Sequence, residues 1–451
     1  MKNKLLFHHP YGKLVSEMIY EILEAVNPSQ SVKKKCSLDD EILHVGQQEY
    51  DLQSFDKVHV IGFGKAVLAM ASGITEVLGD RIAGGYLITK HFDEEMQSLL
   101  PDTITVTKGN HPVPDVDTFK SSAGLVEYIK SIDENDLVIV LISGGGSALC
   151  SAPIPGVTPK EMREMTRQLL ACGAEIQEMN AIRKHLDQIK GGGLAELLSP
   201  ATVTTLILSD VIGSPLDVIA SGPTVPDTAT FDTVSDIFDR YRLWETAPTS
   251  ICQIIKTGQK GEVADTPKEG AQCFLKVQNV LVADNVLACQ TAVDMAKQNQ
   301  MSAYLMTTSL NGEAREAGRV LVSLMEQIRK DNTPFQAPVC LVFGGETTVT
   351  LQGTGLGGRN QELALGALRE LAGLEDVLLV TLATDGEDGP TDAAGAWVTG
   401  ETFTRVKERG LSLVDAMQNN DAYHFFQELN QIVHTGPSGT NVNDVTLCFV
   451  F

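Results

Sequence analysis

Short apolar runs alternate along this chain with longer segments of helical periodicity. The run 137–142 contains only Leu, Val and Ile, a pattern typical of a strand buried in a parallel sheet. Further strands are predicted at 58–61, 86–89, 104–107, 204–208, 277–282, 304–307, 339–343, 347–351, 378–383 and 445–450. Helices are predicted at 64–78, 118–131, 160–172, 285–298, 313–330 and 360–372. Strands that alternate with helices predict an α/β protein with parallel sheets.

Two segments suggest how the chain is divided. The runs 339–343 and 347–351 are joined by Gly344-Gly345-Glu346, which predicts a hairpin and therefore a mixed sheet in the second half. Residues 258–270 are polar and lack apolar periodicity, so we interpret them as a linker. We therefore expect domains at 1–257 and 271–451, although the final strand could return to the first domain.

Length and charge narrow the class of protein. With 451 residues the chain is too long for one typical core, and its formal net charge of −23 argues against a general nucleic-acid binder. The eight cysteines include no C-x-x-C pair, as expected of buried thiols in a reducing, cytoplasmic setting. The apolar stretch within Met1–His9 breaks after three residues, so neither a signal peptide nor a membrane span is predicted.

The run 137–142 ends in a glycine loop. Ligands of open α/β sheets bind beyond the carboxyl ends of the strands, and glycines let backbone N–H groups approach an anion closely. We therefore predict a phosphate-binding loop that consists of Gly144, Gly145, Gly146 and Ser147. A nucleophile elbow is disfavoured because Leu149 replaces its last glycine. A tight turn that needs glycine only for its geometry is the alternative.

Two cations stand where helices are predicted to begin. Lys65 follows Gly62-Phe63-Gly64, but Val67 and the Thr89-Lys90 pair do not match a dinucleotide fingerprint. Arg359 follows Gly357-Gly358, with Asn360 as a predicted N-cap. A cation at a helix N-terminus opposes the helix dipole, so a bound phosphate would explain both residues. A solvated surface lysine is the alternative for Lys65.

Carboxylates and further cations complete the candidate chemistry. Asp210 and Asp385 each follow a predicted strand closely, where a carboxylate can hold Mg²⁺ or accept a proton. Asp388 and Asp392 are interpreted as turn formers. Four cations precede the glycine loop at 191–193 and could bind a carboxylate or phosphate, or form an ordinary basic helix face: Arg183, Lys184, His185 and Lys190.

The motifs together resemble those of the class II glycerate kinases, or glycerate 2-kinases, with a C-terminal MOFRL domain. The matching segments follow one another over nearly the whole chain: Gly62-Phe63-Gly64-Lys65-Ala66, Asn110-His111-Pro112-Val113-Pro114-Asp115, 142–147, Arg183-Lys184-His185-Leu186, Lys190-Gly191-Gly192, Ser209-Asp210-Val211, Ser221-Gly222-Pro223-Thr224, Gly344-Gly345-Glu346-Thr347-Thr348, 357–362, 383–389 and Thr440-Asn441-Val442-Asn443-Asp444.

This resemblance implies a Rossmann-like N-terminal domain, a smaller α/β MOFRL domain with a mixed sheet, and an active site in the cleft between them. It also implies phosphorylation of D-glycerate to 2-phosphoglycerate with ATP and Mg²⁺. The family's active-site positions correspond to Lys65, Asp210, Arg359 and Asp385.

We assign Lys65 and Arg359 to the transferring phosphoryl group, Asp210 to the glycerate hydroxyl and Asp385 to Mg²⁺; the last two roles could be exchanged. Arg183 or Lys190 would hold the substrate carboxylate.

Two other functions compete with this assignment. An NAD(P)H-dependent hydroxypyruvate reductase would use Gly62-Phe63-Gly64 for its cofactor, but the third small residue and the ribose-binding acid are missing. A non-catalytic nucleotide-binding regulator is the second alternative. The expected partners are small molecules, not nucleic acids or membranes, and homo-oligomerisation is compatible with the sequence.

Overall fold

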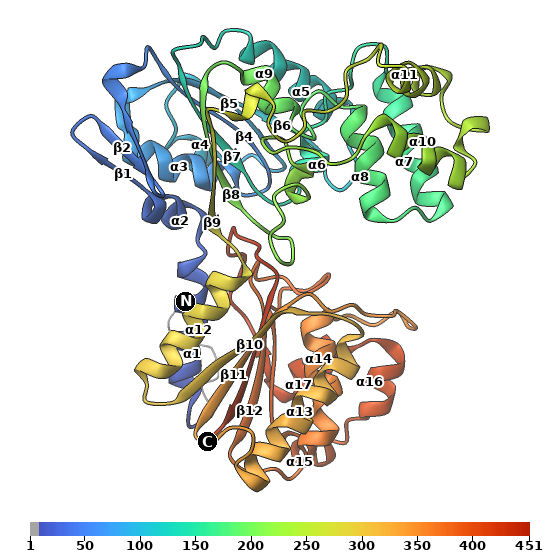
Figure 1. The fold of residues 1–451 in the computed structure, drawn as a ribbon. Coiled ribbons are helices and arrows are strands. Elements are labelled where there is room, and N and C mark those ends of the chain that lie inside the picture. The colour runs from blue at the N-terminus through green and yellow to red at the C-terminus, as the bar shows by residue number, and fades with distance from the viewer. Residues whose placement is uncertain (1–8) are drawn as a thin grey trace. The chain divides into compact units, whose positions relative to one another are not determined.

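The computed structural model describes residues 9–451, which form two compact units (Figure 1). The N-terminal unit comprises Ser31–Ser209 and Ser214–Val282. The C-terminal unit comprises Ala283–Phe451, the short segment Asp210–Gly213, and the chain up to Gln30.

These units divide the chain differently from the predicted ranges 1–257 and 271–451. The interpretation of 258–270 as a linker is corrected, because the following strand β9 (Val277–Ala283) still belongs to the sheet of the N-terminal unit. At the other end, helix α1 (Gly12–Ala25) packs against α12 (Asn285–Gln298) of the C-terminal unit. Polar loops occur inside units as well as between them, so composition alone placed the boundary wrongly.

The N-terminal unit is built on a six-stranded sheet of order β6-β5-β4-β7-β8-β9. Strand β4 pairs in parallel with β5 and β7, β5 with β6, and β7 with β8. The order is that of the doubly wound dinucleotide-binding fold and confirms the predicted Rossmann-like sheet. Its strands before β9 are β4 (Val58–Phe63), β5 (Ile82–Thr89), β6 (Ile104–Lys108), β7 (Leu137–Ile142) and β8 (Thr202–Leu208).

The helices of this unit alternate with the strands, and four of them form a separate cluster beside the sheet (Figure 1). The helices are α2 (Pro28–Lys35), whose first three residues belong to the C-terminal unit, α3 (Val67–Leu78), α4 (Glu94–Gln97), α5 (Val116–Ile129), α6 (Gly146–Leu149), α7 (Pro159–Cys172), α8 (Ile176–His185), α9 (Gly193–Leu198), α10 (Phe231–Arg240) and α11 (Thr249–Gln259). The cluster consists of α7, α8, α10 and α11 around a core that includes Phe238 and Leu169. A small antiparallel sheet of β1 (Cys36–Asp39), β2 (Ile42–Val45) and β3 (Gln48–Asp51) completes the unit.

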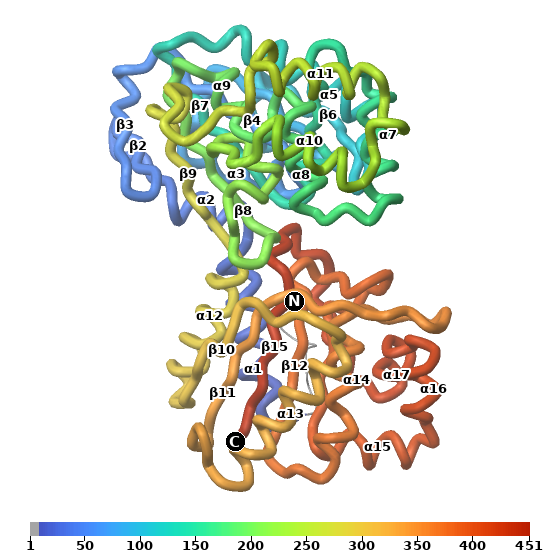
Figure 2. The backbone as a smooth tube through the Cα atoms, turned by 45° about the vertical axis from the view of Figure 1, so that its right-hand side comes forward, coloured from blue at the N-terminus to red at the C-terminus, as the bar shows by residue number. Residues whose placement is uncertain are grey.

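The C-terminal unit contains a mixed six-stranded sheet of order β10-β11-β15-β12-β13-β14. Its strands are β10 (Ser302–Leu310), β11 (Val339–Gly345), β12 (Val377–Ala383), β13 (Gly395–Thr399), β14 (Ile432–Val433) and β15 (Asp444–Val450). The final strand β15 lies antiparallel between β11 and β12, near the middle of the sheet (Figure 2). The mixed sheet was predicted correctly, but for the wrong reason. Residues 347–351 form no strand and no hairpin, since β15 occupies that side of β11.

Helices cover both faces of this sheet. Helices α1 and α12 lie on one face, and α13 (Ala314–Asp331) and α14 (Arg359–Leu371) lie on the other (Figure 1). Helices α13 and α14 pack very closely at two glycines. A Cβ atom on Gly318 would lie 2.1 Å from the Leu363 carbonyl oxygen, and a Cβ atom on Gly366 would lie 2.3 Å from the Arg315 carbonyl oxygen. The remaining helices are α15 (Thr402–Glu408), α16 (Leu413–Asn419) and α17 (Ala422–Leu429).

Two expectations about the whole chain are tested only in part. In the described residues, none of the helices is both long and apolar enough to cross a membrane. All eight cysteines are free, and six of them are buried. The prediction that the N-terminus is not a signal peptide concerns a segment that lies almost entirely outside the described residues.

Candidate active site

Two predicted glycine loops meet at the carboxyl edge of the parallel sheet, where strands β4 and β7 are neighbours. The Lys65 N–H donates to the Gly144 carbonyl at 3.0 Å, and the Ala66 N–H donates to the Ser143 hydroxyl at 3.0 Å. Gly64 has φ +144°, and a Cβ atom there would lie 2.1 Å from the Ser143 hydroxyl. The two loops are therefore joined by hydrogen bonds that only glycine at 64 permits.

The second loop presents donors without acceptors. Gly145 adopts a left-handed conformation, with φ +79°, just before the short helix α6. Within the described chain, the backbone N–H groups of Gly144, Gly145 and Ser147 donate to no protein acceptor. Consecutive unpaired N–H groups beside a left-handed residue form a concave anion site. This arrangement is what a phosphate-binding loop requires, and phosphate binding here stays a prediction.

Lys65 lies against this loop and is exposed. A Cβ atom added to Gly145 would lie 3.3 Å from Lys65 Cε and 3.0 Å from the His111 ring, so both side chains border the loop. No carboxylate pairs with the Lys65 ammonium among residues 9–451. Burial lowers the pKa of His111, and the positive charges of Lys65 and Lys90 lower it further. The sheet edge is therefore positive in a strongly acidic chain.

Ser147 has a partner that the sequence did not single out. Its hydroxyl lies 2.9 Å from the hydroxyl of Ser221, which is fully buried. Ala220 and Ser221 have φ values of +50° and +64°, which are costly for residues with a Cβ atom. Such strain concentrates at functional sites, and here it holds a hydroxyl against the glycine loop. The sequence signal was the segment Ser221-Gly222-Pro223-Thr224, which we used only for the resemblance.

Within residues 9–451, only one of the four predicted cations at 183–190 is without a carboxylate partner. Lys190 is 3% exposed and donates to Asp187 at 2.6 Å and to the Cys150 carbonyl at 2.8 Å. Lys184 forms a second buried pair with Asp227, and the buried His185 ring contacts the carboxylate of the more exposed Asp265. Arg183 has no hydrogen-bonding or ionic partner for its guanidinium in the described part of the chain, and burial lowers its pKa. The geometry favours Arg183 over Lys190 as the residue available to an anion.

Arg359 begins helix α14 in the C-terminal unit and is held between two carboxylates. Its Nε and one terminal nitrogen donate to Asp444 at 2.5 Å and 3.0 Å, and its other terminal nitrogen lies 2.8 Å from Glu346. These contacts use three of the five N–H donors of a guanidinium and fix its plane. Two donors are left for another anion.

Asp210 and Asp385 belong to the same group of charges as Arg359, Glu346 and Asp444. Burial raises the pKa of Glu346; the charge of Arg359 opposes this shift, whereas Asp444, Asp210 and Asp385 add to it. Burial likewise raises the pKa of Asp385, against a hydrogen bond from the Glu387 N–H. Four carboxylates therefore influence one another around a single arginine. Asp210 and Asp385 were predicted from the sequence as candidate site residues. Glu346 and Asp444 appeared there only as members of the segments that match the family.

The start of α14 corrects one sequence interpretation. The helix begins at Arg359 with Gly358 as N-cap, so Asn360 lies inside the first turn. The buried carboxylate of Asp388 accepts from the backbone N–H groups of Asn360 and Gln361, at 3.0 Å and 2.8 Å. Asp388 thus caps α14 from a loop that is distant in sequence, a structural role other than the turn formation that we expected of it.

Comparison with known proteins gives this geometry its context. A domain of unknown function, DUF4147, matches residues 14–256, and the MOFRL family matches residues 339–444. A glycerate 2-kinase of Pyrococcus horikoshii is 38% identical over 96% of each chain. A D-glycerate 2-kinase of Thermotoga maritima is 39% identical over 96% of this chain and 97% of that protein. The chain belongs to the glycerate kinase family. The resemblance stated from the motifs is thereby confirmed.

A solved structure of this glycerate kinase family shares the fold. The crystal structure of glycerate kinase from T. maritima has a TM-score of 0.87 at 38% identity and covers 97% of this chain and 99% of its own. None of these findings supports the alternative of a hydroxypyruvate reductase.

The structure brings the predicted residues of this family member together in two groups. Lys65 and the glycine loop lie in the N-terminal unit, whereas Arg359 and Asp385 lie in the C-terminal unit with Asp210. Among residues 9–451, no three His, Cys, Asp or Glu side chains are close enough to hold a metal ion by themselves. Mg²⁺ usually needs only one or two carboxylates, together with phosphate oxygens and water, so the acid cluster fits Mg²⁺ bound with a nucleotide.

Proposed function

We propose that this chain phosphorylates D-glycerate at its 2-hydroxyl, with ATP as the phosphoryl donor and Mg²⁺ as the accompanying ion. The proposal is carried by the two relatives named glycerate 2-kinase, each at least 38% identical over 96% of this chain. We infer the donor, the ion and the choice of hydroxyl. The side chains described above support the donor and the ion, whereas the choice of hydroxyl rests on the names of the two relatives.

The glycine loop and Lys65 suit the phosphates of ATP. Phosphoryl transfer depends on in-line positioning and charge neutralisation more than on covalent chemistry. Unpaired N–H groups at Gly144, Gly145 and Ser147 would hold phosphate oxygens, while the Lys65 ammonium would neutralise charge on the transferring group.

The acid cluster supports a divalent cation. Glu346, Asp385, Asp444 and Asp210 carry four carboxylates against the single positive charge of Arg359. A nucleotide phosphate would be repelled there unless a cation neutralised the group. Mg²⁺ would supply that neutralisation when bound, and Asp385 is the residue that we propose to hold it.

The remaining residues would handle glycerate itself. Asp210 follows a buried strand and would orient the 2-hydroxyl or accept its proton. Arg183, the partly buried guanidinium without a protein acceptor, would hold the substrate carboxylate. We assign Lys190 to stability instead, because its charge is already neutralised by Asp187.

We further propose that Lys65 and Arg359 act on the same phosphoryl group. The proposal rests on residue type: both cations follow glycines near the start of a helix, an arrangement that a shared polyanion would explain. The Asp210 charge also acts on Glu346, the ion-pair partner of Arg359.

A coupled assay tests the reaction and its regiochemistry. The chain is incubated with D-glycerate, ATP, Mg²⁺, enolase and pyruvate kinase, without phosphoglycerate mutase. Because enolase accepts 2-phosphoglycerate and not the 3-isomer, pyruvate is expected at once. Pyruvate that appears only after mutase is added would show that the 3-hydroxyl is phosphorylated, against our proposal. Oxidation of NADH in the presence of hydroxypyruvate, with no ATP consumption, would favour the reductase instead.

Titration with Mg²⁺ separates the roles of the two aspartates. Asp385→Asn should raise the Mg²⁺ concentration needed for half-maximal rate by about tenfold, with activity partly recovered at high metal, because one anionic ligand is lost. Asp210→Asn should lower kcat at every Mg²⁺ concentration. Asp392→Asn is the matched control, since this exposed residue follows in the same loop, and its carboxylate accepts from the Tyr423 hydroxyl at 2.7 Å and lies 3.9 Å from the His434 ring. The reverse pattern would exchange the two roles, and full activity in both variants would remove them from the site.

A further inference from the structure

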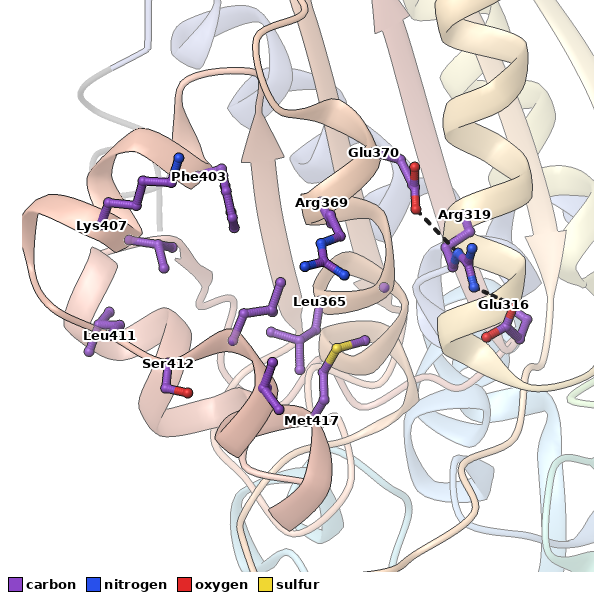
Figure 3. A pocket seen from close by; sticks show the side chains of 14 residues that line it. Glu316, Arg319, Leu365, Arg369, Glu370, Phe403, Lys407, Leu411, Ser412 and Met417 are labelled. Carbon is purple, nitrogen blue, oxygen red and sulfur yellow. Dashed lines mark hydrogen bonds and ion pairs between the residues drawn. The ribbon is translucent and has the colours of Figure 1, made fainter.

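The C-terminal unit contains a cavity of about 330 Å³ among four helices, apart from the residues assigned to catalysis. Helices α13 and α14 form one side, and α15 and α16 with the loop between them form the other (Figure 3). The close packing of α13 and α14 at Gly318 and Gly366 fixes the first side. The cavity therefore has a rigid wall and exists without a ligand.

The floor and the far wall of this pocket are apolar. Leu365 and Val406 are buried at its base, while Val414 is 55% exposed at its edge. The other apolar lining residues are Phe403, Leu411, Leu413 and Met417. An exposed valine beside a continuous apolar lining offers surface that a ligand would remove from water.

Three cations surround this apolar interior, and only one of them is already paired. Arg319 contacts Glu316 at 3.2 Å and Glu370 at 3.4 Å (Figure 3). Lys407 lies over the Phe403 ring, with its Nζ 4.8 Å from the ring centroid. In the described residues, neither the Arg369 guanidinium nor the Lys407 ammonium has a carboxylate partner, although acids outnumber bases by 58 to 35 in the chain. Two exposed cations without a carboxylate partner in the described chain therefore border one apolar pocket, and their charge is available to an anion.

We propose that this pocket binds a small amphiphilic anion, a molecule with one carboxylate or similar head group and a compact apolar body. The head would lie between Arg369 and Lys407, and the body would cover Leu365 and Met417. The volume is at the lower end of the range for small-molecule sites, which limits the body to about the size of a medium-length acyl chain. This inference does not depend on the proposed kinase activity.

Calorimetry on the full chain with octanoate tests the proposal. Octanoate should bind saturably at one site, whereas acetate, which has the head group alone, should give no saturable heat. Octanamide, which keeps the chain but not the charge, should bind at least tenfold more weakly than octanoate. The double variant Arg369→Gln/Lys407→Gln should weaken octanoate binding at least tenfold and leave octanamide binding unchanged, because only the anion uses the two cations.

A matched variant guards against a general effect of lost charge. Arg163→Gln/Lys330→Gln removes one exposed arginine and one exposed lysine elsewhere and should leave octanoate binding as in the parent chain. The proposal is overturned if octanoate gives no saturable binding at millimolar concentration. Equal affinities in the two double variants, or binding at several equivalent sites that neither variant alters, would overturn it as well.

Discussion

Lys65→Met should lower kcat by a factor on the order of 10² or more, with little change in folding, because the ammonium would neutralise the transferring phosphoryl group. The side chain is exposed and borders Gly145, so methionine removes the charge while keeping a chain of similar length. Steady-state kinetics with saturating ATP, D-glycerate and Mg²⁺ measures the effect.

The control lies at the opposite end of the same strand. Lys57 is also exposed and directly precedes β4, whereas Lys65 follows it, so Lys57→Met removes the same charge far from the glycine loop. Lys57→Met should retain full turnover. A kcat of Lys65→Met close to that of the parent chain would show that Lys65 is a solvated surface lysine and not part of the active site.

Arg359→Met should be still more damaging, with a fall in kcat on the order of 10³, the lower range found when an arginine that stabilises a transferring phosphoryl group is lost. Two consequences combine here. The phosphoryl group loses its remaining guanidinium donors, and the carboxylates of Asp444 and Glu346 lose the charge that now neutralises them. Arg359→Lys should recover little, because an ammonium cannot form the bidentate contact with Asp444.

Separate measurements keep this prediction distinct from a loss of folding. Melting temperature should be recorded for every variant, and Asp444→Asn should impair kcat less than Arg359→Met because it leaves the guanidinium present. Arg329→Met provides the matched control, since Arg329 forms an ion pair with Asp376 at 3.1 Å at the end of α13, in the same unit. A variant Arg359→Met that is folded and fully active would show that the arginine serves only its two carboxylates.

Much of the fold could be predicted because its signals are local. The apolar run 137–142 became β7 with the same ends, and the spacing between runs indicated the parallel sheet. Helix α1 had a readable signal that we missed, since Val15, Met18, Ile19 and Ile22 follow helical spacing and are all fully buried. The position of β15 between β11 and β12 had no such signal, because pairing with a distant strand leaves no mark on either segment.

In the candidate site as well, residue types could be predicted from the sequence, whereas contacts between distant residues could not. Cations that directly follow glycine segments could be found from residue type, so Lys65 and Arg359 were singled out as candidates. Charge pairing could not be predicted, because Lys190 and Arg183 are alike in sequence and differ only in that Asp187 neutralises one of them. Ser221 was missed for a similar reason: its backbone strain and its contact with Ser147 exist only in the folded chain.

The path of the chain limits how this protein can be modified. The polypeptide passes between the two units four times, after Gln30, Ser209, Gly213 and Val282. No single recombination point with a relative would therefore exchange one whole unit and leave the other intact. A gene fragment that starts at Ala283 would lack α1 and expose the apolar surface that α1 covers on α12. We therefore expect that the two units can be exchanged or expressed only together, although each of them is compact.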